Sequence, residues 1–284
     1  MPALLITLCV GTLTVQSIFT KQYSLKGLSG DYTFGASKVL FAFLFFLVTT
    51  KDLAITAQIL PYSLGFAAAY TTAIVTTIFA IKTGPLAISS LILSYSLIIP
   101  TMYGFLFRHE PVGLAKCIGI GLLLVSLFLV RSENSGEEEK KVTGKWLLFI
   151  SVAFVGNGMC SVVQNAQQYK FGGAQNGNFM VLALFISFIA LVILAAVFER
   201  KTFLPVLKQG SLYAAAEGLC NGATNLLVMV IIGMVATSVF FPVLSCCQMI
   251  LIFIISAVFY KERFLPRQLA GLGFGLAALV LLNL

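Results

Sequence analysis

The sequence predicts an all-α membrane protein in which ten transmembrane helices form two inverted five-helix repeats. Three observations lead to this prediction. The 284 residues are 59% hydrophobic and 10% charged, whereas a soluble domain carries about 25% charged residues. About ten apolar segments are each long enough to cross a bilayer, and a short motif recurs at the end of each half of the chain. Most of the surface must therefore face lipid.

The apolar segments are about 17–25 residues long, which suits helices that cross a hydrocarbon core of about 30 Å. The content of Gly and Phe, with hardly any long polar run, favours helices over a β-barrel, whose strands would alternate polar and apolar residues. The first segment lacks the positive start and the cleavage site of a signal peptide, so we expect it to stay in the membrane. The helices are expected at 3–20, 32–50, 58–81, 85–107, 112–130, 145–167, 178–198, 209–232, 237–259 and 264–284.

The only long polar stretch runs from Arg131 to Lys145 and divides the chain near its midpoint. Its run of charges is typical of a solvated linker. We therefore expect a first repeat at 1–131, a linker at 132–144 and a second repeat at 145–284. Five crossings per repeat place the two repeats in opposite orientations, with the ligand site between them near the membrane midplane.

A short motif closes each half: Phe-Arg-His-Glu ends at Glu110, and Phe-Tyr-Lys-Glu ends at Glu262, 152 positions later. Each Glu precedes a glycine by nine residues, Gly119 or Gly271. Each glycine belongs to a pair of small residues one helical turn apart, which lets helix backbones approach closely in lipid. We expect these final helices to meet each other or a second copy, so that the protein is a monomer or a homodimer.

A polar stripe marks the segment 209–232. Glu217 lies roughly 13 Å along this helix, where an ionised side chain costs about 2.5–3.5 kcal/mol on insertion scales. Such a residue usually faces a cavity or a partner. Asn221, Thr224 and Asn225 follow on the same helix face. We expect this face to bind substrate. The alternative is a protonated carboxyl that is hydrogen-bonded inside the bundle.

A second stripe begins in the segment 145–167 and consists of Asn157, Ser161, Gln164 and Gln168. Amide groups both donate and accept hydrogen bonds, which suits a polar substrate. Hydrogen bonds between helices are the alternative explanation. Tyr70 and Tyr95 are candidate aromatic walls of the same site, because tyrosine rings attract cations.

Two apolar segments contain prolines that we expect to act in gating. Pro100 frees the carbonyl of Ser96, and Pro242 likewise frees the carbonyl four residues earlier. Such carbonyls are tolerated at membrane depth where protein or a water-filled cavity satisfies them. Ser96 aligns with Gln248 at the 152-residue offset, so we expect both side chains to line the ligand site. Static proline kinks are the alternative.

Charge placement gives two further expectations. Thirteen Lys and Arg residues lie on one side of the predicted helices and four on the other, which places the linker in the cytoplasm and both termini outside. Lys38 lies inside the segment 32–50 instead. We expect its side chain to extend toward the membrane interface, the alternative being a counter-ion opposite Glu217.

Several functions are disfavoured by the composition. The net charge of +8 is scattered among loops, so we expect no nucleic-acid partner. His109 is the only histidine and the six cysteines lie in apolar segments without a CxxC motif, so we expect no metal and no cofactor. A nucleophile–base pair is lacking within the helices, so we expect no enzyme activity.

With its two five-segment halves, its tight turn at Lys82-Thr83-Gly84-Pro85 and its boundary residues Glu110 and Glu262, the chain resembles the drug/metabolite transporter superfamily. The bacterial EamA-like ten-helix transporters are the particular resemblance, although the typical Gly-Glu at the boundary is here His-Glu or Lys-Glu. The resemblance implies a ten-helix inverted-repeat bundle with a central cavity. It also implies a multi-pass protein of the bacterial inner membrane, in a family usually described with cytoplasmic termini, contrary to the Lys and Arg distribution.

We therefore expect a secondary active transporter that works by alternating access. Its substrate would be a small polar or cationic metabolite, bound near Glu217, Asn221, Asn157 and Gln164, and Glu217 could couple transport to protons. The alternative is a helical membrane scaffold or channel-like protein, which would explain the packing and the repeats without a substrate.

Overall fold

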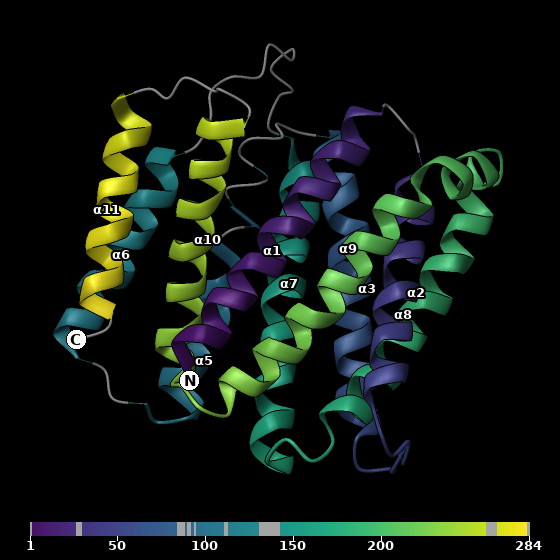
Figure 1. Cartoon of the computed structure of the whole chain (residues 1–284), viewed down its shortest axis with the longest axis horizontal. Helices are drawn as coiled ribbons and strands as arrows, with labels where there is room; N and C mark the ends of the chain where they lie inside the picture. The colour runs from purple at the N-terminus through teal and green to yellow at the C-terminus, as the bar shows by residue number, and fades with distance from the viewer. Residues whose placement is uncertain are drawn as a thin grey trace. The chain divides into compact units, whose positions relative to one another are not determined.

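The computed structural model describes residues 2–26, 30–83, 89, 92–93, 95–110, 113–130, 143–259 and 266–282. All regular structure within these ranges is helical (Figure 1). Most of the predicted linker 132–144 and the second boundary residue Glu262 lie outside the described residues.

The helix positions agree closely with most of the expected segments, but residues 85–88, 90–91 and 94 of the expected segment 85–107 lie outside the described residues. The first sequence half contains α1 (Pro2–Leu25), α2 (Asp31–Thr49), α3 (Leu60–Thr83), η1 (Tyr95–Leu97), α5 (Ile98–Phe107) and α6 (Leu114–Val130). The second half contains α7 (Gly144–Phe171), α8 (Asn176–Phe198), α9 (Phe203–Ile232), α10 (Thr237–Phe259) and α11 (Pro266–Leu282).

Six of the described helices, namely α1, α2, α3, α7, α8 and α9, are long and apolar enough to cross a membrane. Shorter apolar helical stretches occupy Tyr95–Phe107, Leu114–Ser126, Thr237–Gln248 and Leu269–Ala278. Length and composition thus confirm the coarser prediction, an all-α protein with several membrane-spanning helices.

The two prolines that are expected to act in gating, Pro100 and Pro242, differ in their positions. Pro242 lies inside α10, as expected. Pro100 is the third residue of α5. This helix begins at Ile98, directly after the 3-10 turn η1. The first turn of a helix has no intrahelical partner for its N–H groups, so proline costs little there. Pro100 therefore marks the start of a helix and not its interior.

The helices group into two compact units, and each unit draws on both sequence halves. The first unit contains residues 1–75 and 163–234, and the second contains 76–162 and 235–284. Most of α3 and the end of α7 thus belong to the first unit, with the remainder of each in the second.

In the first unit, α9 packs along both α1 and α2, and α2 also packs along α8. Glycines permit the closest of these contacts. A Cβ atom at Gly218 would meet the backbone carbonyl of Lys38, and one at Gly222 would meet the ring of Phe45. Two glycines four residues apart therefore form the face of α9 that approaches α2, a small-xxx-small contact typical of membrane helices.

Hydrogen bonds from the backbone to two side chains tie the ends of α2 and α8 together. The Glu199 carboxylate, just after α8, accepts hydrogen bonds from the backbone N–H groups of Tyr32 (3.0 Å) and Thr33 (2.8 Å) at the start of α2. Just after α2, the Ala54 N–H donates to the Asn178 side chain at the start of α8 (3.2 Å). The end of each helix thus meets the beginning of the other, so α2 and α8 are antiparallel.

In the second unit, α6 and α11 pack along each other, and α10 packs against both α5 and α11. The first of these pairs is the contact expected between the final helices of the two sequence halves. Ser126 of α6 donates a hydrogen bond to the carbonyl of Gly271 in α11. After α5, the Glu110 carboxylate accepts hydrogen bonds from the N–H groups of Thr237 and Ser238, both 2.8 Å, and so caps α10.

Candidate functional site

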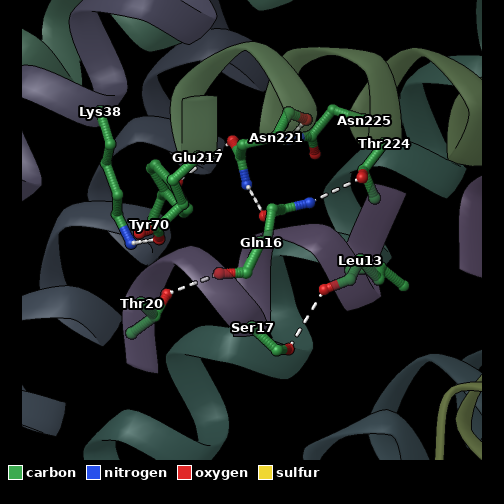
Figure 2. Close-up of polar contacts among 10 residues, drawn as sticks. All are labelled: Leu13, Gln16, Ser17, Thr20, Lys38, Tyr70, Glu217, Asn221, Thr224 and Asn225. Carbon is green, nitrogen blue, oxygen red and sulfur yellow. Dashed lines mark hydrogen bonds and ion pairs between the residues drawn. The ribbon is translucent and has the colours of Figure 1, made fainter. Parts of the chain in front are cut away.

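An ion pair lies inside the first unit. The Lys38 ammonium of α2 and the Glu217 carboxylate of α9 are 3.0 Å apart (Figure 2). The Glu217 side chain is 5% exposed and that of Lys38 is 24% exposed, so the lysine is the more accessible partner. Only one carboxylate oxygen of Glu217 is engaged: Oε2 is buried and has no hydrogen-bond partner among the described residues.

This pair corrects the expectation for Lys38. The side chain was expected to extend toward the membrane interface, but it turns to Glu217 across the α2–α9 contact. The reason is the close approach at Gly218, which brings the backbone of Lys38 onto α9 one residue from Glu217. An ammonium at this depth is better stabilised by a neighbouring carboxylate than by stretching to distant water.

A chain of hydrogen bonds continues the polar stripe of α9 onto α1. The Asn221 amide donates to Gln16 Oε1 (3.1 Å), and the Gln16 amide donates to Thr224 Oγ1 (2.7 Å), as Figure 2 shows. Thr224 in turn lies 2.8 Å from Thr12 Oγ1 on α1. Each of these groups is therefore satisfied by another side chain of the same network.

Two further helices join this network. Tyr70 of α3 donates its hydroxyl proton to Asn221 Oδ1 at 3.4 Å. Gln164 of α7 donates to Asn225 Oδ1 at 2.7 Å, and Asn225 donates to Asn221 Oδ1 at 3.1 Å. The structure thus brings together six of the expected substrate-binding residues, which are Glu217, Asn221, Thr224, Asn225, Gln164 and Tyr70.

Other expected site residues belong to the second unit. Asn157 of α7 donates to Ser96 Oγ at 2.7 Å, where the neighbouring Gly158 lets α7 approach the backbone of Ser96. Tyr95 donates to the carbonyl of Leu124 at 2.9 Å. Ser161 and Gln248 are half-buried in α7 and α10.

A small pocket in the second unit lies beside Tyr95, between η1, α5, α6 and α10. Its lining is mainly aliphatic, with hydroxyl groups from three side chains. The lining residues are Tyr95, Leu97, Ile98, Thr101, Ile120, Leu123, Leu124, Pro242 and Ser245. Of the expected site residues, Tyr95 and Pro242 thus face this pocket.

Sequence reasoning missed Gln16, Thr12 and the Gly218–Gly222 contact. A signal for the glycines was present, because Gly-x-x-x-Gly follows directly after Glu217. Gln16 is also the only amide side chain in the predicted segment 3–20. Within the part of the chain that the structure describes, no cluster of His, Cys, Asp and Glu could hold a metal ion.

Comparison with known proteins adds information on the fold only. No protein-family model and no curated protein matches this chain. Solved structures do match it. One, described only as the crystal structure of a protein, superposes with a TM-score of 0.78 over 99% of this chain and 95% of its own, at 11% sequence identity. At that identity the likeness concerns the fold alone.

Proposed function

We propose that the protein is a secondary active transporter for a small polar metabolite, working by alternating access in a membrane. The observation that carries the proposal is the Lys38–Glu217 ion pair, held in apolar helices with one Glu217 oxygen unpartnered among the described residues. Charged side chains at such depth are rare and usually belong to substrate or ion pathways.

The energetic cost supports a functional reading of the pair. Each charged side chain near a helix centre costs about 2.5–3.5 kcal/mol on insertion scales. A buried ion pair often contributes no more to stability than well-packed apolar side chains of similar volume. A pair whose only purpose was to hold α2 on α9 would thus be a costly solution, because Gly218 and Gly222 already give close packing.

Two antiparallel copies of one five-helix repeat are part of this proposal. The antiparallel arrangement of α2 and α8 supports two inverted copies, because these are the second helices of the two sequence halves. Each of them ends where the other begins. The final helices α6 and α11 also pack together. We place the protein with the EamA-like transporters of the bacterial inner membrane on the boundary residues Glu110 and Glu262.

Proton coupling through Glu217 belongs to the same proposal, because Glu217 supplies the carboxylate of the ion pair in the first unit.

Reconstitution in proteoliposomes tests the proposal. Purified protein should accelerate the exchange of a labelled metabolite mixture across the bilayer, and Glu217→Gln should abolish that exchange. Lys208→Met is the matched control, because it removes an exposed charge from the same helix without touching the ion pair.

A scaffold predicts a different result. The side chains of the network bond mostly to one another, as expected of a static bundle. No exchange above protein-free liposomes, by protein that remains folded, would favour the scaffold. Flux that shows no saturation and no counterflow would favour a channel-like protein.

A further inference from the structure

The ion pair restricts the charge that a ligand of the first unit can carry. Lys38 and Glu217 together carry no net charge when both are ionised. A ligand that is only a cation would bind Glu217 and leave the Lys38 ammonium without its partner. An anion would bind Lys38 and leave the Glu217 carboxylate uncompensated. Leaving one member of a buried pair unpaired is strongly unfavourable.

A neutral polar ligand finds few free partners here. The Gln16 side chain already bonds Asn221 through its oxygen and Thr224 through its nitrogen. Asn221 also accepts hydrogen bonds from Tyr70 and Asn225. A ligand without charge would have to break these bonds and reproduce each of them, since buried polar groups left unpaired are costly.

We propose that the Lys38–Glu217 pair is the recognition site for a zwitterion, a small molecule that carries both an ammonium and a carboxylate. The ligand carboxylate takes the place of Glu217 at Lys38, and the ligand ammonium takes the place of Lys38 at Glu217. Each protein charge then exchanges one counter-ion for another. This inference rests on the proposed transport function and specifies its substrate class.

Two features determine the order in which the ligand groups meet Lys38 and Glu217. Lys38 is the more accessible partner, so the ligand carboxylate meets it first. Glu217 Oε2 has no hydrogen-bond partner among the described residues, and it offers a ready acceptor for an ammonium. Both new contacts are charge-assisted hydrogen bonds, the stronger kind. The pair thus opens as the ligand binds and closes again after release.

Counterflow with matched probes tests this substrate class. Proteoliposomes are loaded with one unlabelled probe, and the uptake of labelled neutral α-amino acids is followed. The probes are neutral α-amino acids, their methyl esters, which are cations, and their N-acetyl derivatives, which are anions. We expect the amino acids to drive uptake and each singly charged derivative to be weaker by at least about tenfold, the loss of one charged hydrogen bond.

A charge-balanced variant tests the site. Lys38→Met with Glu217→Gln removes both charges together and leaves neither partner unpaired. We expect this double variant to stay folded by size-exclusion chromatography and to lose amino-acid counterflow by at least about tenfold. Lys208→Met should retain it. Counterflow unchanged in a folded double variant would overturn the proposed site.

The remaining outcomes separate this inference from the transport function. Methyl esters or N-acetyl derivatives as effective as the amino acids would overturn it, because one charge would suffice. Exchange of a labelled polyol, with no response to any amino acid, would overturn the substrate class and leave transport standing. Proteoliposomes that match protein-free liposomes for every probe, polyol included, would overturn both. The three wild-type probe sets decide the question even if the double variant fails to fold.

Discussion

Gly218 of α9 lies with its α-carbon against the backbone carbonyl of Lys38 in α2. The next residue toward the start of α9 is Glu217, whose carboxylate pairs with the ammonium of that same lysine. The close backbone approach and the ion pair are therefore one structural arrangement, in which the missing side chain of Gly218 places the two charges 3.0 Å apart.

Gly218→Ala should separate these helices. The new methyl group would meet the Lys38 carbonyl and the Phe41 Cβ atom, both of which belong to the packed α2 helix. Overpacking of this kind costs about 1–3 kcal/mol, so we expect a lower melting temperature in detergent by intrinsic fluorescence. Gly11→Ala on α1 is the control, because open space surrounds that position. Equal melting temperatures for both variants would contradict the argument.

Removing one charge of the ion pair should lower the stability of the protein more than removing both charges. Lys38→Met leaves a buried carboxylate, which destabilises by about 3–5 kcal/mol, and Glu217→Gln leaves a half-buried ammonium, which destabilises less because water reaches it. The double variant leaves neither, so its melting temperature should lie above those of both single variants. Thermal melts of the four proteins form a double-mutant cycle that measures this coupling. Additive losses would show that the two charges do not interact.

Gln16→Leu should disturb the network from the side of α1. It removes the acceptor of the Asn221 amide and one of the partners of Thr224, which keeps its hydrogen bonds to Thr12 and to the carbonyl of Cys220. We expect destabilisation of about 1–3 kcal/mol, measured by thermal melting. Thr20→Ala is the matched control, because this exposed hydroxyl donates to the backbone carbonyl of Gln16 in its own helix and lies outside the side-chain network. If the melting temperature of Gln16→Leu is no lower than that of the control, the network does not contribute to stability.

The carboxylate caps should each contribute to stability. Glu110→Gln weakens two hydrogen bonds at the start of α10, and Glu199→Gln weakens three around Thr33 and Tyr32 of α2. Helix caps are worth about 0.5–2 kcal/mol, and their loss should lower the melting temperature in both variants. Asp52→Asn removes an exposed carboxylate elsewhere and should have no effect. Caps without a stabilising role would give three equal melting temperatures.

The helices were predictable from the sequence because length and apolarity suffice to recognise a membrane span. The predicted segment 178–198 became α8 at Asn176–Phe198, and 237–259 matched α10 at its bounds. Helix ends were harder: α9 begins six residues before the predicted 209, since Phe203, Leu204 and Pro205 are compatible with a helix start. The break before Pro100 was missed because proline position alone does not separate a kink from a new helix.

The candidate site was predictable on one helix and not across helices. Periodicity placed Glu217 and Asn221 on one face of α9, because that depends only on helical geometry. Their partners Lys38 and Gln16 lie 179 and 205 residues away in sequence. Which face of α1 or α2 turns toward α9 depends on packing at Gly218 and Gly222, and a single helix does not encode it. The grouping into two units drawn from both sequence halves is likewise a property of the packing.

The antiparallel pair α2 and α8 is tied together at both extremities, by Glu199 at one and by Asn178 at the other. Because the two helices are joined at both ends, neither can slide or tilt relative to the other, and we expect them to move as one rigid body. In the proposed transport cycle, the helices of the first unit that move to uncover Lys38 are therefore expected to be α9 and α1, which shift relative to the α2–α8 pair. Spin labels on α2 and α8 should keep a constant separation throughout turnover, while a label on α9 changes its distance to both.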